Sequence, residues 1–320
     1  MAPSPDSIRI ATWNLERPSL ASWKRLPAIR KVIEAVGADI WILTESRTTL
    51  TPVADYLGLH SAPHRARRED PDERWVSIWS RWLIRLVVER PTPWSLSVIS
   101  ESPIGALLIR GLVLPYHAEP DPSGGPTRRW AEFSRELELQ GEDWLRLRER
   151  YPEMPLVIAG DFNQSLDGSN YYESTSTRKR LTESLEGSGM RCLTTEDGVR
   201  AGRLVKNHLI DHVCASAGIE VLGDIACWEG WVESSDGTRT TMSDHPGVAV
   251  NLRGPSSARN ENDPSQGQQQ VDCLRPAQGV EESNSRTPSS DGGGSSTGAS
   301  GQAAKHSGIG GARGPAVNFC

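Results

Sequence analysis

The sequence predicts an α/β fold, and three observations carry that prediction. Several short apolar runs have the length and composition of β-strands. Amphipathic segments with helical spacing lie between some of these runs. An acidic, amide or histidine side chain repeatedly follows an apolar run directly. We therefore expect buried strands, amphipathic helices between them, and polar side chains where the strands end.

The first expected elements occupy the N-terminal part of the chain. Residues 7–14 alternate polar and apolar side chains, as a half-buried strand does. Residues 26–37 have apolar side chains at helical spacing, and Gly37 suits a C-terminal cap. Residues 39–44 form a nearly continuous apolar run, typical of a strand that is buried on both faces. This run ends at Glu45, so a carboxylate closes a buried strand.

The middle of the chain continues this pattern. Residues 74–83 and 104–115 are expected to be strands, and His117 follows the second of them. Aromatic and apolar side chains at helical spacing predict a helix over residues 130–147, with Gly141 as a position where it could be interrupted.

Three further apolar runs in the second half each adjoin polar residues. Residues 156–159 form a short strand that leads into Gly160-Asp161-Phe162-Asn163. Residues 209–213 form a brief strand interrupted by an acid. The segment Met242-Ser243-Asp244-His245-Pro246 precedes a last expected strand at residues 247–252.

Composition divides the chain into two parts. We expect a catalytic domain at residues 1–253, followed by a disordered low-complexity tail at residues 254–320. Gly, Ser, Gln, Asn and Pro dominate the second part, as in the runs at residues 268–270 and 292–296. Such a segment cannot bury enough apolar surface to offset the entropy lost on ordering.

Charge and cysteine content exclude several classes of protein. Lys and Arg number 35 and Asp and Glu 41, a formal net charge of −6, so the chain is not a polybasic nucleic-acid binder. The five cysteines have no paired short spacing, which argues against a disulfide framework or a zinc site. Without a signal-peptide pattern or a long apolar run, we expect a cytoplasmic protein with no membrane span. We also expect a monomer.

Six short motifs occur in one order along the chain, and most of them include a polar residue beside an expected strand. They are Thr12-Trp13-Asn14-Leu15-Glu16, Leu43-Thr44-Glu45-Ser46, Ile78-Trp79-Ser80-Arg81, Gly160-Asp161-Phe162-Asn163-Gln164, Ile210-Asp211-His212-Val213 and Ser243-Asp244-His245-Pro246. By these motifs, residues 7–252 resemble the endonuclease/exonuclease/phosphatase superfamily. The resemblance implies a four-layer α/β sandwich, in which two mixed sheets pack face to face with helices outside. It also implies an active site at one rim of the sheets.

The resemblance also implies a metal-dependent phosphoric ester hydrolase. Hard divalent ions such as Mg²⁺ or Mn²⁺ prefer oxygen ligands. Glu45 is therefore assigned as the primary metal ligand, with the amide oxygen of Asn14 and the carboxylate of Asp244 as further ligands.

The remaining site residues are assigned to the activation of water and the binding of phosphate. His245 is expected to be the general base, with Asp211 orienting it, because a carboxylate beside an imidazole fixes its tautomer. By the resemblance, Asp161 and Asn163 position the nucleophile and contact the scissile phosphate. His117 is expected to donate to a phosphoryl oxygen.

Several alternatives remain open at this stage. We expect a phosphoester substrate, possibly nucleic acid, and a phosphodiesterase or nuclease leads. A phosphomonoesterase, a lipid phosphodiesterase or a non-catalytic binding module of the same fold are the alternatives. A serine hydrolase is not expected, because the one G-x-S-x-G match, at residues 294–298, lies in the low-complexity part.

The sequence also predicts roles for several other aromatic and polar residues. Most of the tryptophans are expected to pack in the core, whereas Trp228 and Trp231 are candidates for substrate contact. His212 is expected to be structural. Glu16 is expected to lie either behind the site or on the surface.

Overall fold

The computed structural model describes residues 6–63, 71–87, 92–234 and 236–255. These residues belong to one unit, residues 1–260. The low-complexity tail predicted from residue 254 falls almost entirely outside the described residues, so it stays a prediction.

The first large sheet has seven strands and is mixed. Its order is β11-β15-β1-β2-β4-β3, with β12 pairing with β15. The strands are β1 (Ile8–Asn14), β2 (Ile40–Arg47), β3 (Leu57–His60), β4 (Glu73–Ser80), β11 (Glu220–Val221), β12 (Ala226–Trp228) and β15 (Gly247–Arg253). β1 runs parallel to β2 and antiparallel to β15.

The second large sheet has six strands in the order β5-β6-β7-β8-β10-β9. They are β5 (Ile84–Leu86), β6 (Ser95–Ser102), β7 (Gly105–Val113), β8 (Leu156–Asp161), β9 (Met190–Cys192) and β10 (Asp211–Ser216). β7 and β8 are parallel, whereas the other neighbours are antiparallel. A separate two-stranded sheet contains β13 (Trp231–Glu233) and β14 (Arg239–Thr241).

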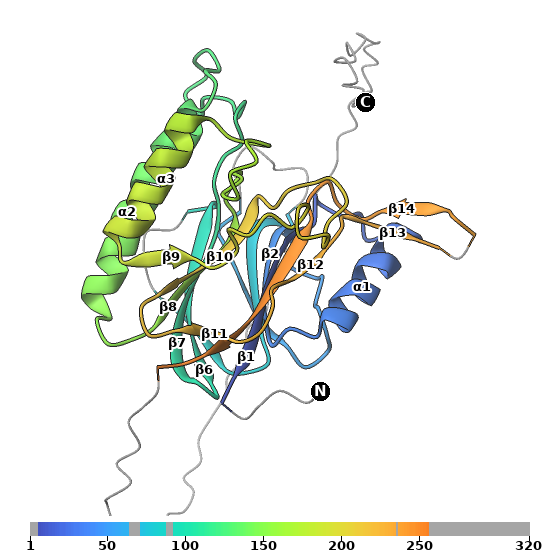
Figure 1. The fold of residues 1–320 in the computed structure, drawn as a ribbon, viewed down its shortest axis with the longest axis horizontal. Coiled ribbons are helices and arrows are strands. Elements are labelled where there is room, and N and C mark those ends of the chain that lie inside the picture. Colours follow the sequence, from blue (N-terminus) through green and yellow to red (C-terminus); the bar gives the residue numbers. More distant parts are fainter. Residues whose placement is uncertain (1–5, 64–70, 88–91, 235, 256–320) are drawn as a thin grey trace, which may run out of the picture. The chain divides into compact units, whose positions relative to one another are not determined.

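The helices cover the outer faces of the two large sheets (Figure 1). They are α1 (Arg25–Val36), α2 (Ala131–Arg150) and α3 (Thr175–Gly187). One apolar cluster lies between the sheets, a second joins α1 to the first sheet, and a third joins α2 and α3 to the second sheet. The result is the four-layer α/β sandwich expected from the motifs.

Helix α2 is continuous, without the interruption considered at Gly141. A Cβ built on Gly141 would approach Ser184 of α3 at 3.8 Å, so the glycine lies where the two helices meet. Packing therefore outweighs the low helix propensity of glycine, which costs about 1 kcal/mol relative to alanine.

An unusual polar anchor holds α2 against the second sheet. Arg110 of β7 is almost fully buried, and its guanidinium donates to Asp143 at 2.8 Å and to Gln140 at 2.8 Å. It also donates to Ser97 of β6 at 3.0 Å. A buried cation needs such partners because desolvating it is expensive.

Candidate active site

Strand direction brings the predicted site residues to one rim of the sandwich. β1 and β2 are parallel, so Asn14 and Glu45 lie toward the same ends of their strands. β15 is antiparallel to β1 and begins at that rim, just after Asp244 and His245. In the second sheet, Asp161 ends β8 and lies opposite Asp211, which begins β10. β1 packs against both β8 and β10, so the two sheets contribute to one site.

His245 and Asp211 form a buried pair that joins the sheets. The Nδ1 of His245 lies 2.6 Å from Oδ2 of Asp211. The backbone N–H of His245 donates to the Ser243 hydroxyl, which in turn donates to the carbonyl of Asn14 at the end of β1. The indole N–H of Trp13 donates to the carbonyl of His245 at 3.0 Å. The imidazole is thus fixed from both its side chain and its backbone.

Asp161 receives three hydrogen bonds. Its Oδ1 accepts from the backbone N–H of Asn163 at 2.8 Å. Its Oδ2 accepts from the side-chain amides of Asn163 and Asn14, both at 3.0 Å. The Asn163 amide also donates to the Leu114 carbonyl, so Asn163 ties Asp161 to the end of β7.

The glycine before Asp161 is required by the backbone. Gly160 has a φ of 144°, and a Cβ at this position would lie 1.9 Å from the carbonyl oxygen of Leu112. No other residue fits this contact. The first residue of Gly160-Asp161-Phe162-Asn163 therefore allows β7 and β8 to approach closely and places Asp161 at the rim.

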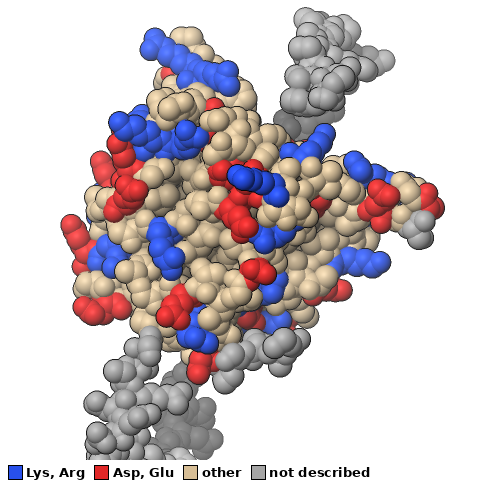
Figure 2. Space-filling view, viewed as in Figure 1, with Lys and Arg blue, Asp and Glu red and all other residues tan. Residues whose placement is uncertain are grey.

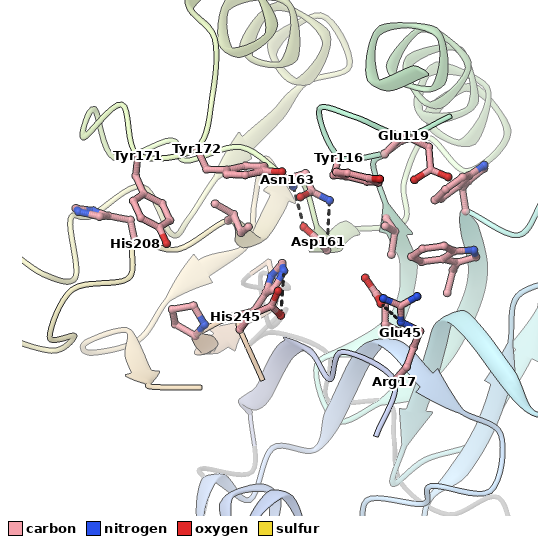
Figure 3. Close-up of a pocket in the computed structure, with 17 residues that line it drawn as sticks. Arg17, Glu45, Tyr116, Glu119, Asp161, Asn163, Tyr171, Tyr172, His208 and His245 are labelled. Atoms are coloured by element: carbon pink, nitrogen blue, oxygen red, sulfur yellow. Dashed lines mark hydrogen bonds and ion pairs between the residues drawn. The ribbon is translucent and has the colours of Figure 1, made fainter. Parts of the chain in front are cut away.

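Glu45 lies across the cavity from His245 (Figure 3). Its carboxylate accepts from the Asn14 amide at 3.2 Å and pairs with the Nε of Arg17 at 2.7 Å. The backbone N–H of Arg17 donates to the Glu45 carbonyl, which holds the loop after β1 against β2. Burial raises the pKa of Glu45, and Arg17 opposes that rise.

Asn14 is oriented differently from the sequence prediction. Its amide nitrogen faces Glu45 and Asp161, while its oxygen accepts from the backbone N–H of Glu16 at 2.8 Å. The amide oxygen would have to turn away from Glu16 to bind a cation. In this structure Asn14 positions the two carboxylates instead of presenting a ligand atom. Glu16 itself pairs with Arg25 at 3.0 Å, behind the site.

Asp244 and His117 lie at the margin of the site. The Asp244 side chain is 66% exposed, and its Oδ1 lies 3.8 Å from Nε2 of His245. The Nδ1 of His117 lies 2.8 Å from the Tyr172 hydroxyl, and its ring packs between Trp130 and Tyr172. His117 is not among the residues that line the cavity. Its contact with a phosphoryl oxygen therefore stays a prediction.

A cavity of about 380 Å³ opens over these residues. It is lined by Arg17, Glu45, Trp75, Trp94, Val113, Pro115, Tyr116, Glu119, Asp161, Asn163, Tyr171, Tyr172, His208, Ile210, Asp244, His245 and Pro246. Tyr171, Tyr172 and His208 lie on one side of Asp161 and Asn163, and Tyr116 and Glu119 lie on the other (Figure 3). Asp161 and Asn163 thus have aromatic side chains on each side.

Sequence reasoning missed most of these wall residues. Arg17 and Tyr116 are close in sequence to the predicted site residues Asn14 and His117, and only that proximity could have suggested them. His208 is fixed by the Asp167 carboxylate at 2.7 Å, a contact that joins two separate loops.

Substrate contact by Trp228 and Trp231 stays a prediction, and the structure places both away from this cavity. The Trp228 ring packs edge-on against Trp13 and Trp41 in the core, and the guanidinium of Arg239 lies 3.7 Å from the centre of the Trp231 ring. His212 is buried, with Nδ1 2.9 Å from Thr194 Oγ1 and Nε2 2.9 Å from the Gln164 carbonyl, so it is structural as expected.

The site has an excess of negative charge. Arg17 is the only Lys or Arg among the described residues that line the cavity, which also include four carboxylates. Burial raises the pKa of Asp161. Burial alone would lower the pKa of His245, but Asp161 and Asp211 outweigh it and raise that pKa to about 10. The imidazole is therefore charged at neutral pH.

This charge distribution fits a divalent cation. The Oδ1 of Asp211 is buried without a hydrogen-bond partner. Asp161 and Asp211 place carboxylate oxygens within 4.8 Å of each other, and Glu45 and Asp244 add two further carboxylates to the cavity. Oxygen-rich groups of this kind suit Mg²⁺ or Mn²⁺. The arrangement can hold a cation, position a phosphoryl group beside it and transfer protons.

The sequence model of the endonuclease/exonuclease/phosphatase family matches residues 11–245. The chain belongs to this family. Solved structures similar to this chain include the catalytic domain of human Nocturnin, determined with bound sulfate. It is 17% identical in sequence, with a TM-score of 0.50, and the match covers 78% of this chain and 94% of the Nocturnin chain. A mannosyl-6-phosphatase of Bacteroides thetaiotaomicron is 16% identical with a TM-score of 0.51, covering 77% and 99%.

At these identities, the likeness to solved structures supports the fold alone and does not identify a substrate or a reaction. No curated protein matches the chain in sequence. None of the described helices is long and apolar enough to cross a membrane.

Proposed function

We propose that this protein is a divalent-cation-dependent hydrolase of phosphodiesters. The observation that carries the proposal is the convergence of Glu45, Asp161, Asn163 and the Asp211–His245 pair on one cavity. Acid, amide and imidazole groups from both sheets meet there, as phosphoester hydrolysis requires.

A bound Mg²⁺ or Mn²⁺ ion would polarise the phosphoryl oxygens and lower the pKa of a nearby water. Glu45 is the ligand that the structure supports best, because its carboxylate is partly buried, faces the cavity and pairs with one cation, Arg17. Asp244 is the proposed ligand on the opposite side. Asn14, which was also predicted as a ligand, orients Glu45 and Asp161 through its amide nitrogen.

The structure favours an exchange of the roles first assigned to His245 and Asp161. A general base must be unprotonated, and the carboxylates around His245 hold it in its charged form at neutral pH. A charged imidazole donates to a phosphoryl oxygen and stabilises the negative charge that develops there. Burial raises the pKa of Asp161 to about 8 in the cation-free protein. The charge of a bound divalent cation would lower that pKa and leave a carboxylate that can take a proton from the attacking water. Asn163 fixes that carboxylate.

Two features of the cavity favour a diester over a monoester. A diester carries one negative charge and a monoester up to two. A cavity lined by four carboxylates, with Arg17 and the charged His245 as its lining cations, disfavours the second charge. A diester also has an organic group on each side of phosphorus. The aromatic walls on both sides of Asp161 provide a surface for each group (Figure 3).

The surface gives no special support to a long nucleic acid as substrate. Acidic and basic side chains are interspersed over the visible face, and no continuous basic stripe crosses it (Figure 2). Nucleic acid therefore belongs in the substrate panel as one diester among others.

The test is hydrolysis of bis-p-nitrophenyl phosphate, p-nitrophenyl phosphate, plasmid DNA and RNA, each with Mg²⁺, with Mn²⁺ and with EDTA. We expect cation-dependent cleavage of a diester that Asp161→Asn and His245→Ala each reduce by at least about 10²-fold. The matched control is Asp224→Asn, the same change at an exposed acid outside the cavity. Preferred cleavage of the monoester would refute the diester assignment. Full activity of either site variant would refute the site.

A further inference from the structure

Two cysteines lie opposite each other on neighbouring strands behind the active site. Cys192 ends β9 and Cys214 lies within β10, and the antiparallel register pairs them directly. Both are free thiols. Residues that lie directly opposite in an antiparallel pair point to the same face of the sheet.

The local hydrogen bonding shows which kind of pair this is. The N–H of Leu193 donates to the carbonyl of Val213 at 2.8 Å, so the next pair along the strands is a hydrogen-bonded one. Because the two kinds alternate, Cys192 and Cys214 form a non-hydrogen-bonded pair, in which the Cα atoms are about 4.5 Å apart. A disulfide needs Cα atoms separated by about 4.4–6.8 Å. The backbone is therefore already within the range that a disulfide requires.

The surroundings of the two thiols differ. Cys214 is fully buried in the apolar cluster beneath α2 and α3, whereas Cys192 lies at the border of that cluster and is partly exposed. The Cys214 thiol is in hydrogen-bond contact with Cys192, and this contact, followed by His212, lowers the pKa of the Cys192 thiol. Burial raises the pKa of Cys214. An attacking thiolate at Cys192 and a resolving thiol at Cys214 follow from this asymmetry.

We propose that Cys192 and Cys214 form a reversible oxidation site, which closes as a disulfide across β9 and β10 when the protein meets a peroxide. The Cys192 thiolate attacks one peroxide oxygen, which yields a sulfenic acid and releases hydroxide, or water once that is protonated. The sulfur of Cys214 then displaces the sulfenic hydroxyl, which leaves as a second water after taking up the thiol proton. Two thiols are oxidised by two electrons and one peroxide is reduced, so the step balances. A dithiol reverses it.

The disulfide would enclose one wall of the cavity within a covalent ring. The segment between the two cysteines contains His208 and Ile210, which line the cavity, and Asp211, which holds His245. In the oxidised protein, the closed ring restricts the loop from β9 to β10. In the reduced protein, that loop stays free to open. The inference does not depend on the proposed reaction, because its test reads the thiols directly.

The experiment treats the full chain carrying Cys227→Ser with hydrogen peroxide, blocks remaining thiols with N-ethylmaleimide and digests with trypsin. Cys227 is removed because it shares a tryptic peptide, residues 207–239, with Cys214. We expect this peptide to appear linked to residues 192–200, with a mass lower than the sum of the two by two hydrogen atoms. Dithiothreitol should separate them. In Cys214→Ser, dimedone should trap Cys192 as the sulfenic acid.

Other outcomes would overturn the proposal. Complete N-ethylmaleimide labelling of both cysteines after peroxide would show that the pair does not oxidise. Sulfinic or sulfonic acid at Cys192 in the protein that retains Cys214 would show that Cys214 does not resolve it. Linkage of either cysteine to Cys273 or Cys320 would show that the cross-strand pairing is not the preferred one. Cys227 in the unmodified protein is the matched control, because its cross-strand neighbour is Val248.

Discussion

Replacing Asp161 with Asn should increase the stability of the metal-free protein while abolishing its activity. The carboxyl group is 1% exposed, and burial raises its pKa from 3.8 to about 8. The unfolded chain releases this proton near its ordinary pKa, whereas the folded protein retains it. The Asp161 carboxyl group therefore destabilises the folded protein increasingly as pH rises from about 4 to about 8. Above about pH 8 this destabilisation stays constant.

The magnitude follows from the two competing effects of the substitution. At pH 7 the raised pKa costs up to about 4 kcal/mol, because each unit is worth about 1.4 kcal/mol. The Asn amide cannot accept all three hydrogen bonds from Asn14 and Asn163, which costs about 1–3 kcal/mol. The charge of His245 also favours the carboxylate. We expect a net gain of about 1 kcal/mol at neutral pH and above, and a loss near pH 4.

The assay is urea unfolding in EDTA, followed by tryptophan fluorescence, from about pH 4.5 to about pH 8.5. The stability curves of Asp161→Asn and the unmodified protein should cross, since the cost of the carboxyl group grows with pH. Asp224→Asn should run parallel to the unmodified protein. A variant that is less stable at every pH, or a difference that does not change with pH, would refute the assignment of a strained, buried carboxyl group. Mg²⁺ should stabilise the unmodified protein more than the variant.

Three further predictions test other parts of the structure. Arg17→Ala should bind Mg²⁺ several-fold more tightly by calorimetry, because the guanidinium no longer competes for Glu45. Its kcat/KM for a diester should fall about 10-fold. Weaker Mg²⁺ binding by the variant would contradict this prediction. Gly160→Ala should lose at least about 3 kcal/mol in urea unfolding, because its Cβ would overlap the Leu112 carbonyl, whereas Gly187→Ala, which meets no atom, should be tolerated. Arg110→Met should lower the free energy of unfolding by about 3 kcal/mol, because Asp143 stays buried beside fewer cations. Adding Asp143→Asn should recover part of that loss. No recovery in the double variant would count against the ion pair.

The strands that lead into the candidate site, and the polar residues at their ends, could be predicted because the information is local. Gly160-Asp161-Phe162-Asn163 contains both the glycine that permits close strand approach and the acid that this approach places at the rim. Apolar runs before Glu45 and Asp161 likewise indicated buried strands. These features depend on neighbours in sequence, which pattern reasoning can use.

The orientation of side chains could not be predicted, because it depends on contacts between distant segments. The Asn14 oxygen is taken by the Glu16 N–H, in a loop where Glu16 and Arg17 both have left-handed φ angles that their residue types rarely adopt. The charged state of His245 depends on two acids from the other sheet. No local pattern in the sequence contains either fact.

The Asn14–Asp161 and His245–Asp211 hydrogen bonds each link one sheet of the sandwich to the other. A small sliding movement between the sheets would break both bonds at once, even with every strand intact. Core substitutions far from the rim that alter the spacing of the sheets should therefore reduce turnover before they unfold the protein. Activity therefore depends on the alignment of the two sheets. A measured loss of activity should reveal a change in core packing before the melting temperature falls.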